Sequence, residues 1–542
     1  MTSLALAPPI PFGALAPEIL LAVAACVVLV LGQSRREAVR RTVVPSLTLA
    51  AVGLGIVVLR GPELLGWWSL ADSGGSGLYY DQLAQFVRVS ALILGFIIVL
   101  ASWHQARPEE CGEFFSMLLL SLCGLMLVGP SADLVILFLA LELVSIPTYI
   151  LVVLGRLGPR GLEAGTKYFY LGALAAAITA YGFSFLYGVA GSATMDALAI
   201  ERISSALRNP GSTEYALATA GVVISLLGLA FKIAAVPLHL YIADVYQGAA
   251  APIAGMLGFV PKLAGFVALM RIVTLTEWGT LSGGLFWFLW VVAALSMTVG
   301  NVLALRQTNV RRLLAYSGIA HSGYMLVGVL AGPSAGEGFL GDGAAGVLYY
   351  VVIYGLANLG AFTLLGLLRV EGQACESIRD LNGLLRRAPG PALLLALSML
   401  TLMGLPPTAG FWGKMSLFGS ALAATSQVPL AAHDWLVALV VIAVLNTAIA
   451  AAYYLRVIAS VLLVESDQPA EMAPREAQYW GALLCGFLIL FFSFYPNALL
   501  GQGRQATTDI RQRVAQNDGD ALAQRETPVA RGVAGLPVPK GE

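Results

Sequence analysis

The chain has 542 residues, of which 58% are hydrophobic and 11% are charged, and its mean hydropathy is +0.81. Soluble domains carry about 25% charged residues, so this composition predicts an all-α protein that crosses a membrane many times. The formal net charge is zero and the sequence contains no basic cluster with interleaved aromatic residues. Nucleic acid is therefore not expected as a partner.

The sequence offers no pattern that would hold a metal or a cofactor. Its five cysteines are scattered without the paired spacing of a metal site, and we interpret them as small apolar side chains. Phosphate-binding loops, CxxC pairs and HExxH do not occur in the sequence. We expect no metal and no cofactor in this chain, so any redox chemistry would take place in partner subunits. The N-terminal residues lack a basic segment, so we expect the first helix to direct insertion.

Apolar segments of about 20 residues predict fourteen membrane spans. In chain order they are 15–32, 42–60, 79–101, 113–129, 132–155, 165–189, 216–247, 251–275, 284–305, 310–331, 343–368, 391–425, 434–464 and 478–500. The seventh and twelfth spans should be broken helices, at Pro237 and at Pro406-Pro407, because proline removes a backbone donor and clashes with the preceding turn. Interrupted helices at corresponding places in two halves are typical of transporters built from inverted repeats.

The broken helices suggest how the chain is divided. We expect N-terminal helices in 1–112, a first five-helix repeat in 113–275, a second in 276–464, a last helix in 465–500 and a polar, disordered tail in 501–542. Seventeen Lys and Arg side chains fall on one side of the predicted spans and four on the other. Because positive loops stay in the cytoplasm, both termini are expected outside it.

Three lysines lie deep inside predicted spans. Lys232 comes five residues before Pro237, Lys262 lies in the next span, and Lys414 follows the second break. A charged group at the bilayer centre costs at least ~2.5–3.5 kcal/mol, so it marks an ion or proton pathway by default. The alternative interpretation is that the lysines extend to the membrane surface, but their depth in the spans disfavours it.

Glu142 is the acidic side chain near the middle of the fifth span. A buried carboxylate without a partner takes up a proton, whereas one paired with Lys232 stays ionised and switches when that partner moves. The alternative is a structural ion pair that fixes helix packing. We predict the switching role.

Three further titratable residues are weaker candidates for a proton relay: His239, His321 and Asp244. A lone histidine in a span is about as often a hydrogen-bonded core residue as a relay member, and the aspartate could instead cap a half-helix. Arg88 lies seven residues after Asp81 and is expected to be its counter-charge on the same helix face.

Several segments resemble the subunit N family of bacterial respiratory complex I, the proton-pumping NADH:quinone oxidoreductase, whose mitochondrial counterpart is subunit 2. The segments are AFKIAAVPLHLYIADVYQGAAAPIAGMLGFVPKLAGF, ALRQTNVRRLLAYSGIAHSGYMLVG and GLPPTAGFWGKMSLF, with support from FLALELVSIPTYIL and EAGTKYFYLGALAAAI. The resemblance covers nearly the whole chain and implies an antiporter-like fold of two inverted five-helix repeats.

The resemblance also assigns roles residue by residue. It implies that Glu142 is the family's glutamate of helix five, and that Lys232, Lys262 and Lys414 are its lysines of helices seven, eight and twelve. A lysine at the last position favours subunit N over subunit M, which usually has glutamate there. The family's usual VYEG here has Gln247, which weakens any claim for an acid at that position.

The function implied is proton transfer from Lys232 through Lys262 to Lys414, driven by electron transfer from NADH to quinone, with Glu142 setting the proton affinity of Lys232. Flavin mononucleotide, iron–sulfur clusters, NADH and quinone are expected in partner subunits, next to subunits M, K and J in the bacterial inner membrane. The alternatives are a subunit of a free-standing Mrp-like cation/proton antiporter, a membrane subunit of an ion-pumping hydrogenase, or a structural module that has lost pumping.

Overall fold

The computed structural model describes residues 13–59, 78–156, 158–276, 284–333, 341–424, 430–466 and 470–508. Twelve helices in these ranges are long and apolar enough to cross a membrane, and two shorter apolar helices, α1 (Ala16–Gly32) and α17 (Pro389–Met403), accompany them. The polytopic helical fold is confirmed. The count of fourteen spans stays a prediction, because α1 and α17 are shorter than a full crossing.

Each of the fourteen predicted segments contains a helix or a pair of helices. The other long helices are α2 (Val44–Leu59), α4 (Gln82–Ser102), α5 (Cys111–Val128), α6 (Leu134–Gly155), α7 (Pro159–Ala190), α9 (Thr213–Lys232), α12 (Val260–Thr274), α13 (Gly284–Leu305), α14 (Val310–Ala331), α15 (Gly343–Leu367), α18 (Ala409–Ala423), α19 (Leu430–Leu462) and α20 (Glu476–Phe494). Shorter helices are α8 (Ala197–Leu207), α10 (Ile242–Gly248), α11 (Ala251–Leu257) and α16 (Leu384–Arg387), with π and 3-10 turns at Val39–Val43, Pro108–Glu110 and Ile378–Leu381.

Both predicted helix breaks are present. The seventh span stops at Lys232, continues as a non-helical linker and resumes as α10, and the twelfth is divided into α17 and α18 by residues 404–408. Each linker contains its prolines, which cannot donate a backbone hydrogen bond. The eighth span is also interrupted, between α11 and α12, directly before Pro261. This third interruption was not predicted.

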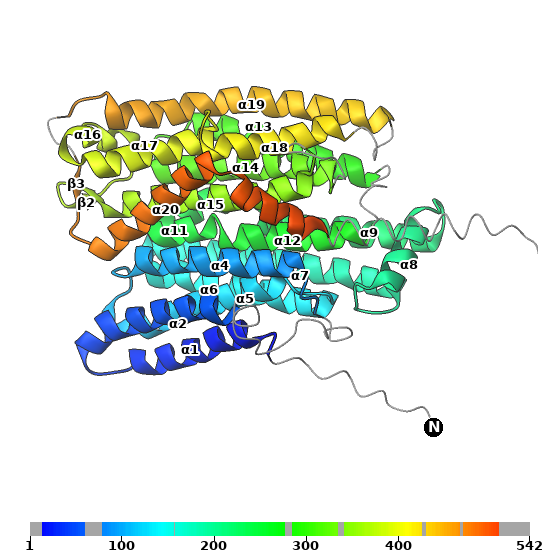
Figure 1. Cartoon of the computed structure of the whole chain (residues 1–542), viewed down its shortest axis with the longest axis horizontal. Coiled ribbons are helices and arrows are strands. Elements are labelled where there is room, and N and C mark those ends of the chain that lie inside the picture. Colours follow the sequence, from blue (N-terminus) through cyan, green and yellow to red (C-terminus); the bar gives the residue numbers. More distant parts are fainter. Residues whose placement is uncertain are drawn as a thin grey trace, which may run out of the picture.

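The helices run side by side, with α1 and α2 at one edge of the molecule and α19 at the opposite edge (Figure 1). The central elements are the most deeply buried: the most apolar stretch of α15 and that of the span containing α11 and α12 are both 100% buried inside the protein, and that of α14 is 94% buried. By contrast, only 33% of the most apolar stretch of α19 is buried. Of the helices that carry the three lysines, α12 lies in this buried centre, α9 packs against α12, and α18 packs against α14 and α15.

Helix α20 joins two parts of the chain that are far apart in the sequence. α20 packs against both α4 and α15. Gly481 of α20 lies against Ala101 of α4, and Cys485 lies against Gly360 of α15. The small residues let these backbones approach closely.

Part of the expected tail is folded. Residues 497–508 form a helix in which Ala506 and Thr507 are buried, and Thr507 donates a hydrogen bond of 2.6 Å to Asp342 at the start of α15. The expected disorder of 501–542 is thus wrong for 501–508, because this helix has an apolar side that packs on the protein. Residues 509–542 lie outside the described residues.

Two small features occupy loops that the sequence left unassigned. α8 lies in the loop expected at 190–214; Asp196 caps its N-terminus, and Ala199, Ile200 and Ile203 form its buried face. A three-stranded antiparallel sheet joins β1 (Leu368–Val370) to β2 (Gln373–Ala374) and β3 (Glu471–Met472). The sheet connects the end of α15 to the segment that leads into α20.

The predicted pairing of Arg88 with Asp81 is wrong. Arg88 forms a buried ion pair with Glu18 of α1, at 2.6 Å, and both side chains are 3% exposed. Asp81 caps α4 by accepting from the backbone N–H of Ala84, and it pairs with Arg271 of α12 at 2.8 Å. Each charge of α4 thus finds its partner on another helix, because capping turns Asp81 away from the face that carries Arg88.

Candidate functional site

The site begins where α9 breaks. The Lys232 ammonium lies 3.1 Å from a carboxylate oxygen of Glu142 and donates a hydrogen bond of 2.6 Å to Ser145 Oγ. Lys232 is the last residue of α9, where the negative end of the helix dipole favours a cation. The predicted contact between Glu142 and Lys232 is present, and its role in proton transfer stays a prediction.

The Ile233 carbonyl, left without a helical partner at this break, is connected to the second lysine through Ser322. Ile233, the first residue of the linker, accepts a short hydrogen bond from Ser322 Oγ on α14 through its carbonyl. Lys262 Nζ in turn donates to Ser322 Oγ at 2.9 Å and to the Gly318 carbonyl. Lys262 is 1% exposed. A carbonyl left unpaired by the helix break is thus one link in a polar chain between Lys232 and Lys262.

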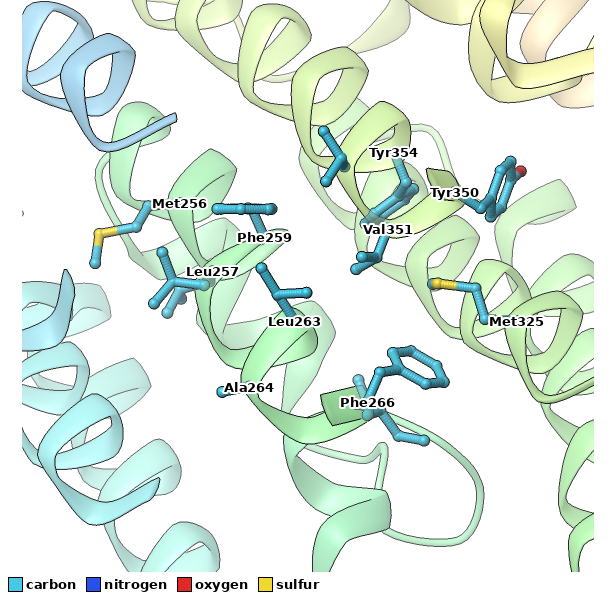
Figure 2. Packing of buried hydrophobic residues seen from close by; sticks show 14 of the residues in the cluster. Met256, Leu257, Phe259, Leu263, Ala264, Phe266, Met325, Tyr350, Val351 and Tyr354 are labelled. Atoms are coloured by element: carbon cyan, nitrogen blue, oxygen red, sulfur yellow. The ribbon is translucent and has the colours of Figure 1, made fainter. Parts of the chain in front are cut away.

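An aromatic cage follows Lys262. The Lys262 ammonium lies 4.5 Å from the centre of the Tyr354 ring, and that ring lies 5.0 Å from the imidazole of His321. His321 is hydrogen bonded through both ring nitrogens, with Nδ1 2.8 Å from the Tyr350 hydroxyl and Nε2 2.9 Å from the Tyr454 hydroxyl. Figure 2 shows Tyr350 and Tyr354 projecting from neighbouring turns of α15 among the buried side chains beside α12.

The third lysine lies beyond the histidine. Lys414 Nζ donates a hydrogen bond of 2.8 Å to the carbonyl of Met403, the last residue of α17, and lies 5.0 Å from the centre of the Tyr324 ring. The Tyr324 ring is 5.7 Å from that of His321. As at the first break, a carbonyl at the C-terminal end of a half-helix faces a group of the polar chain. An ammonium at this position is favoured by the helix dipole.

Together these contacts form one buried run across the middle of the protein. Its titratable members, in spatial order, are Glu142, Lys232, Lys262, His321 and Lys414. Each ammonium is paired, hydrogen bonded or placed on an aromatic face, as buried charges require. Hydroxyl, carbonyl and aromatic-ring contacts link its successive members.

The two remaining candidates lie elsewhere. Asp244 on α10 is 2.7 Å from Lys167 and 2.7 Å from Arg312, and its side chain is 36% exposed. This cluster ties α10 to α7 and α14. His239 lies in the linker before α10, partly exposed. Among the described residues neither contacts Glu142 or the three central lysines, so a relay role for them has no support in the geometry.

The sequence did not single out the uncharged members of the site. These are Ser145, Ser322, Tyr324, Tyr350, Tyr354 and Tyr454. Tyr350 and Tyr354 are four residues apart and so lie on one face of α15, which was a usable signal. Serine and tyrosine are common in membrane spans, and only the packing of α14 on α15 and α19 shows which of them face the lysines. In the parts of the chain that the structure describes, no group of His, Cys, Asp and Glu could hold a metal ion.

Comparison with known proteins agrees with this geometry. Residues 131–446 match the sequence model of a family described as "NADH:quinone oxidoreductase/Mrp antiporter, TM". A curated relative named NADH-quinone oxidoreductase subunit N, from Trichlorobacter lovleyi, is 36% identical over 413 residues, which are 75% of this chain and 79% of that protein. The chain belongs to the subunit N family of NADH-quinone oxidoreductase.

Solved structures extend the comparison to the fold. A chain of respiratory complex I from Thermus thermophilus superposes with a TM-score of 0.71 at 30% identity, covering 90% of this chain and 98% of that one. A chain of the Mrp complex from Dietzia sp. DQ12-45-1b gives a TM-score of 0.76 at 19% identity, covering 94% and 99%. The second likeness shows a shared fold. The antiporter-like architecture is thus common to subunit N and to an Mrp chain.

Proposed function

We propose that this subunit N chain is a proton-translocating module of the membrane arm of NADH:quinone oxidoreductase. The observation that carries the proposal is the run of contacts that begins at the partly buried Glu142 and continues through the buried Lys232 and Lys262 to Lys414. Charged groups at this depth are costly, so by default they mark an ion or proton pathway. The redox groups and substrates, NADH, flavin, iron–sulfur clusters and quinone, belong to partner subunits.

The first step is electrostatic. With the Glu142 carboxylate 3.1 Å away, Lys232 holds its proton. When the pair separates, the ammonium is left buried without its anion and releases the proton. The next titratable group is Lys262, which the Ser322 hydroxyl joins to the Ile233 carbonyl beside Lys232.

The middle of the path depends on His321. A neutral imidazole donates from one nitrogen and accepts at the other. Because both nitrogens face tyrosine hydroxyls, a proton received on one side can be matched by a proton given up on the other. Lys414 then receives the proton and passes it to the outer side.

We further propose where the subunit lies in its assembly. The distribution of positive loops supports a bacterial inner-membrane protein with both termini in the periplasm. Family membership supports contact with other complex I membrane subunits, subunits M, K and J being the expected neighbours.

A free-standing Mrp-like antiporter subunit is the second candidate, favoured by the shared fold. The two functions differ in partners. Co-purification with flavin and iron–sulfur subunits supports complex I, whereas sodium-dependent growth and isolation only with other antiporter chains would support the antiporter.

The decisive experiment measures NADH-driven quinone reduction and proton uptake in membrane vesicles that carry Lys232→Ala. Lys167→Ala is the matched control, because Lys167 is also ion-paired within the protein but pairs with Asp244 and Glu163 instead. We expect loss of both activities in Lys232→Ala with the complex assembled, and near-normal activity in the control. Unchanged pumping in Lys232→Ala would overturn the proposed path.

A further inference from the structure

A buried amide outside the lysine run makes three side-chain hydrogen bonds. Asn301 on α13 is 0% exposed. Its Nδ2 donates to the Tyr324 hydroxyl at 3.0 Å and to Asn446 Oδ1 at 3.2 Å, and its Oδ1 accepts from the Tyr453 hydroxyl at 2.9 Å. An amide is suited to this position, because it donates and accepts at once.

The two tyrosines bonded to Asn301 are each connected to a different residue of the proposed proton path. Tyr324 is the residue whose ring faces Lys414 Nζ at 5.0 Å. Tyr453 packs its ring 4.5 Å from that of Tyr454, whose hydroxyl meets His321 Nε2. Asn301 therefore bonds Tyr324, whose ring lies on Lys414, and Tyr453, which packs on the tyrosine that contacts His321.

We propose that Asn301 is a positioning residue for this step: it holds the Tyr324 ring on the Lys414 ammonium and, through Tyr453, steadies the Tyr454 hydroxyl on His321. The inference rests on the proposed function. Its physical basis is that the attraction between an ammonium and an aromatic face requires the ring to stay in place. The Tyr324 hydroxyl is bonded to Asn301, at the end of the ring away from the backbone, so the amide restrains the ring's swing.

The competing explanation is that Asn301 only joins α13, α14 and α19, as polar side chains often do between membrane helices. If Asn301 only joins these helices, its replacement weakens assembly but does not change how the assembled complex responds to pH. Positioning predicts a changed pH response in the assembled complex. The two explanations therefore differ in what they predict for intact protein.

The test uses the whole complex in inverted vesicles, with Asn301→Leu, Tyr324→Phe and the double variant. Gln478→Leu is the matched control: Gln478 is 1% exposed and bonds the Thr363 carbonyl between α20 and α15, away from the lysines. The measurements are assembled complex per vesicle, NADH-driven proton uptake and quinone reduction from pH 6 to 9.

For Asn301→Leu we expect normal assembly, a several-fold fall in pumping, and an alkaline limb of the pH profile moved to lower pH by about half to one unit, the size of a lost cation–π contact. Tyr324→Phe keeps the ring but loses its anchor, so it should reproduce the shift, and the double variant should add little to it. The control should keep the wild-type profile.

Two results would overturn the proposal. One is an assembled Asn301→Leu complex with the wild-type pH profile, and the other is a shift equal to that of Gln478→Leu. If Asn301→Leu does not assemble, Tyr324→Phe carries the test alone, and a wild-type profile there has the same meaning. Lys414→Ala separates this inference from the proposed function. Full proton pumping in Lys414→Ala would refute the proton path itself. Loss of pumping in Lys414→Ala together with a wild-type pH profile in Asn301→Leu would refute only the positioning role.

Discussion

Replacing Glu142 by glutamine removes one charge from the buried pair while nearly keeping its shape. At 3.1 Å and an effective dielectric constant near 20, the attraction between this carboxylate and Lys232 is about 5 kcal/mol. A glutamine oxygen still accepts a hydrogen bond, which retains about 1 kcal/mol, so the protonated form of Lys232 loses roughly 3–4 kcal/mol. At 1.4 kcal/mol per tenfold change, the proton-binding constant of Lys232 falls by about two to three orders of magnitude.

The assay is NADH-driven proton uptake by vesicles, normalised to assembled complex, between pH 6 and 8. We expect Glu142→Gln to pump at least about tenfold more slowly at pH 7.5, and to recover partly as the pH falls, because a higher proton concentration restores loading of Lys232. Ser145→Ala removes a neutral hydrogen-bond acceptor that lies 2.6 Å from the same ammonium, and it should cost less than the loss of the carboxylate charge. Full pumping by Glu142→Gln, or a defect no smaller at pH 6, would refute the electrostatic argument.

Two further predictions concern packing and charge away from the Glu142 pair. In Gly318→Ala the added Cβ would lie 2.7 Å from the Tyr354 hydroxyl, so the ring must move by several tenths of an ångström, and we expect pumping to fall several-fold while the yield of assembled complex, measured on native gels, stays normal. Arg88→Leu leaves Glu18 buried without its partner and should lower stability by about 3–5 kcal/mol; the double variant with Glu18→Gln should recover much of this in thermal unfolding, and no recovery would mean that the charges are not coupled.

The sequence was most informative where a residue type conflicts with its surroundings. Lys232, Lys262 and Lys414 stand out because an ammonium in an apolar span is costly, and the prolines beside two of them mark the breaks that supply free carbonyls. The membrane helices could be predicted from the apolar segments, because the length of these segments matches the thickness of a bilayer.

What the sequence did not reveal depends on contacts between distant segments. Arg88 had a plausible partner on its own helix, yet α1 packs against α2 and α5, which both contact α4, and this packing brings Glu18 to Arg88. Asn301 and Tyr324 resemble ordinary span residues until α13, α14 and α19 come together. The third interruption, before Pro261, was missed because a proline near a helix start is usually tolerated.

The position of α20 has a consequence for biogenesis. This helix fills the seam between α4 and α15, but it is made long after α4. From Ser102 at the end of α4 to Glu476 at the start of α20, the ribosome adds about 370 residues, which takes roughly 20–75 s at 5–20 residues per second. The seam exists once α15 ends at Leu367, and it then waits about 110 further residues, roughly 5–22 s, for α20. Insertion of α20 therefore joins α4, which is made early, to α15, which is made much later.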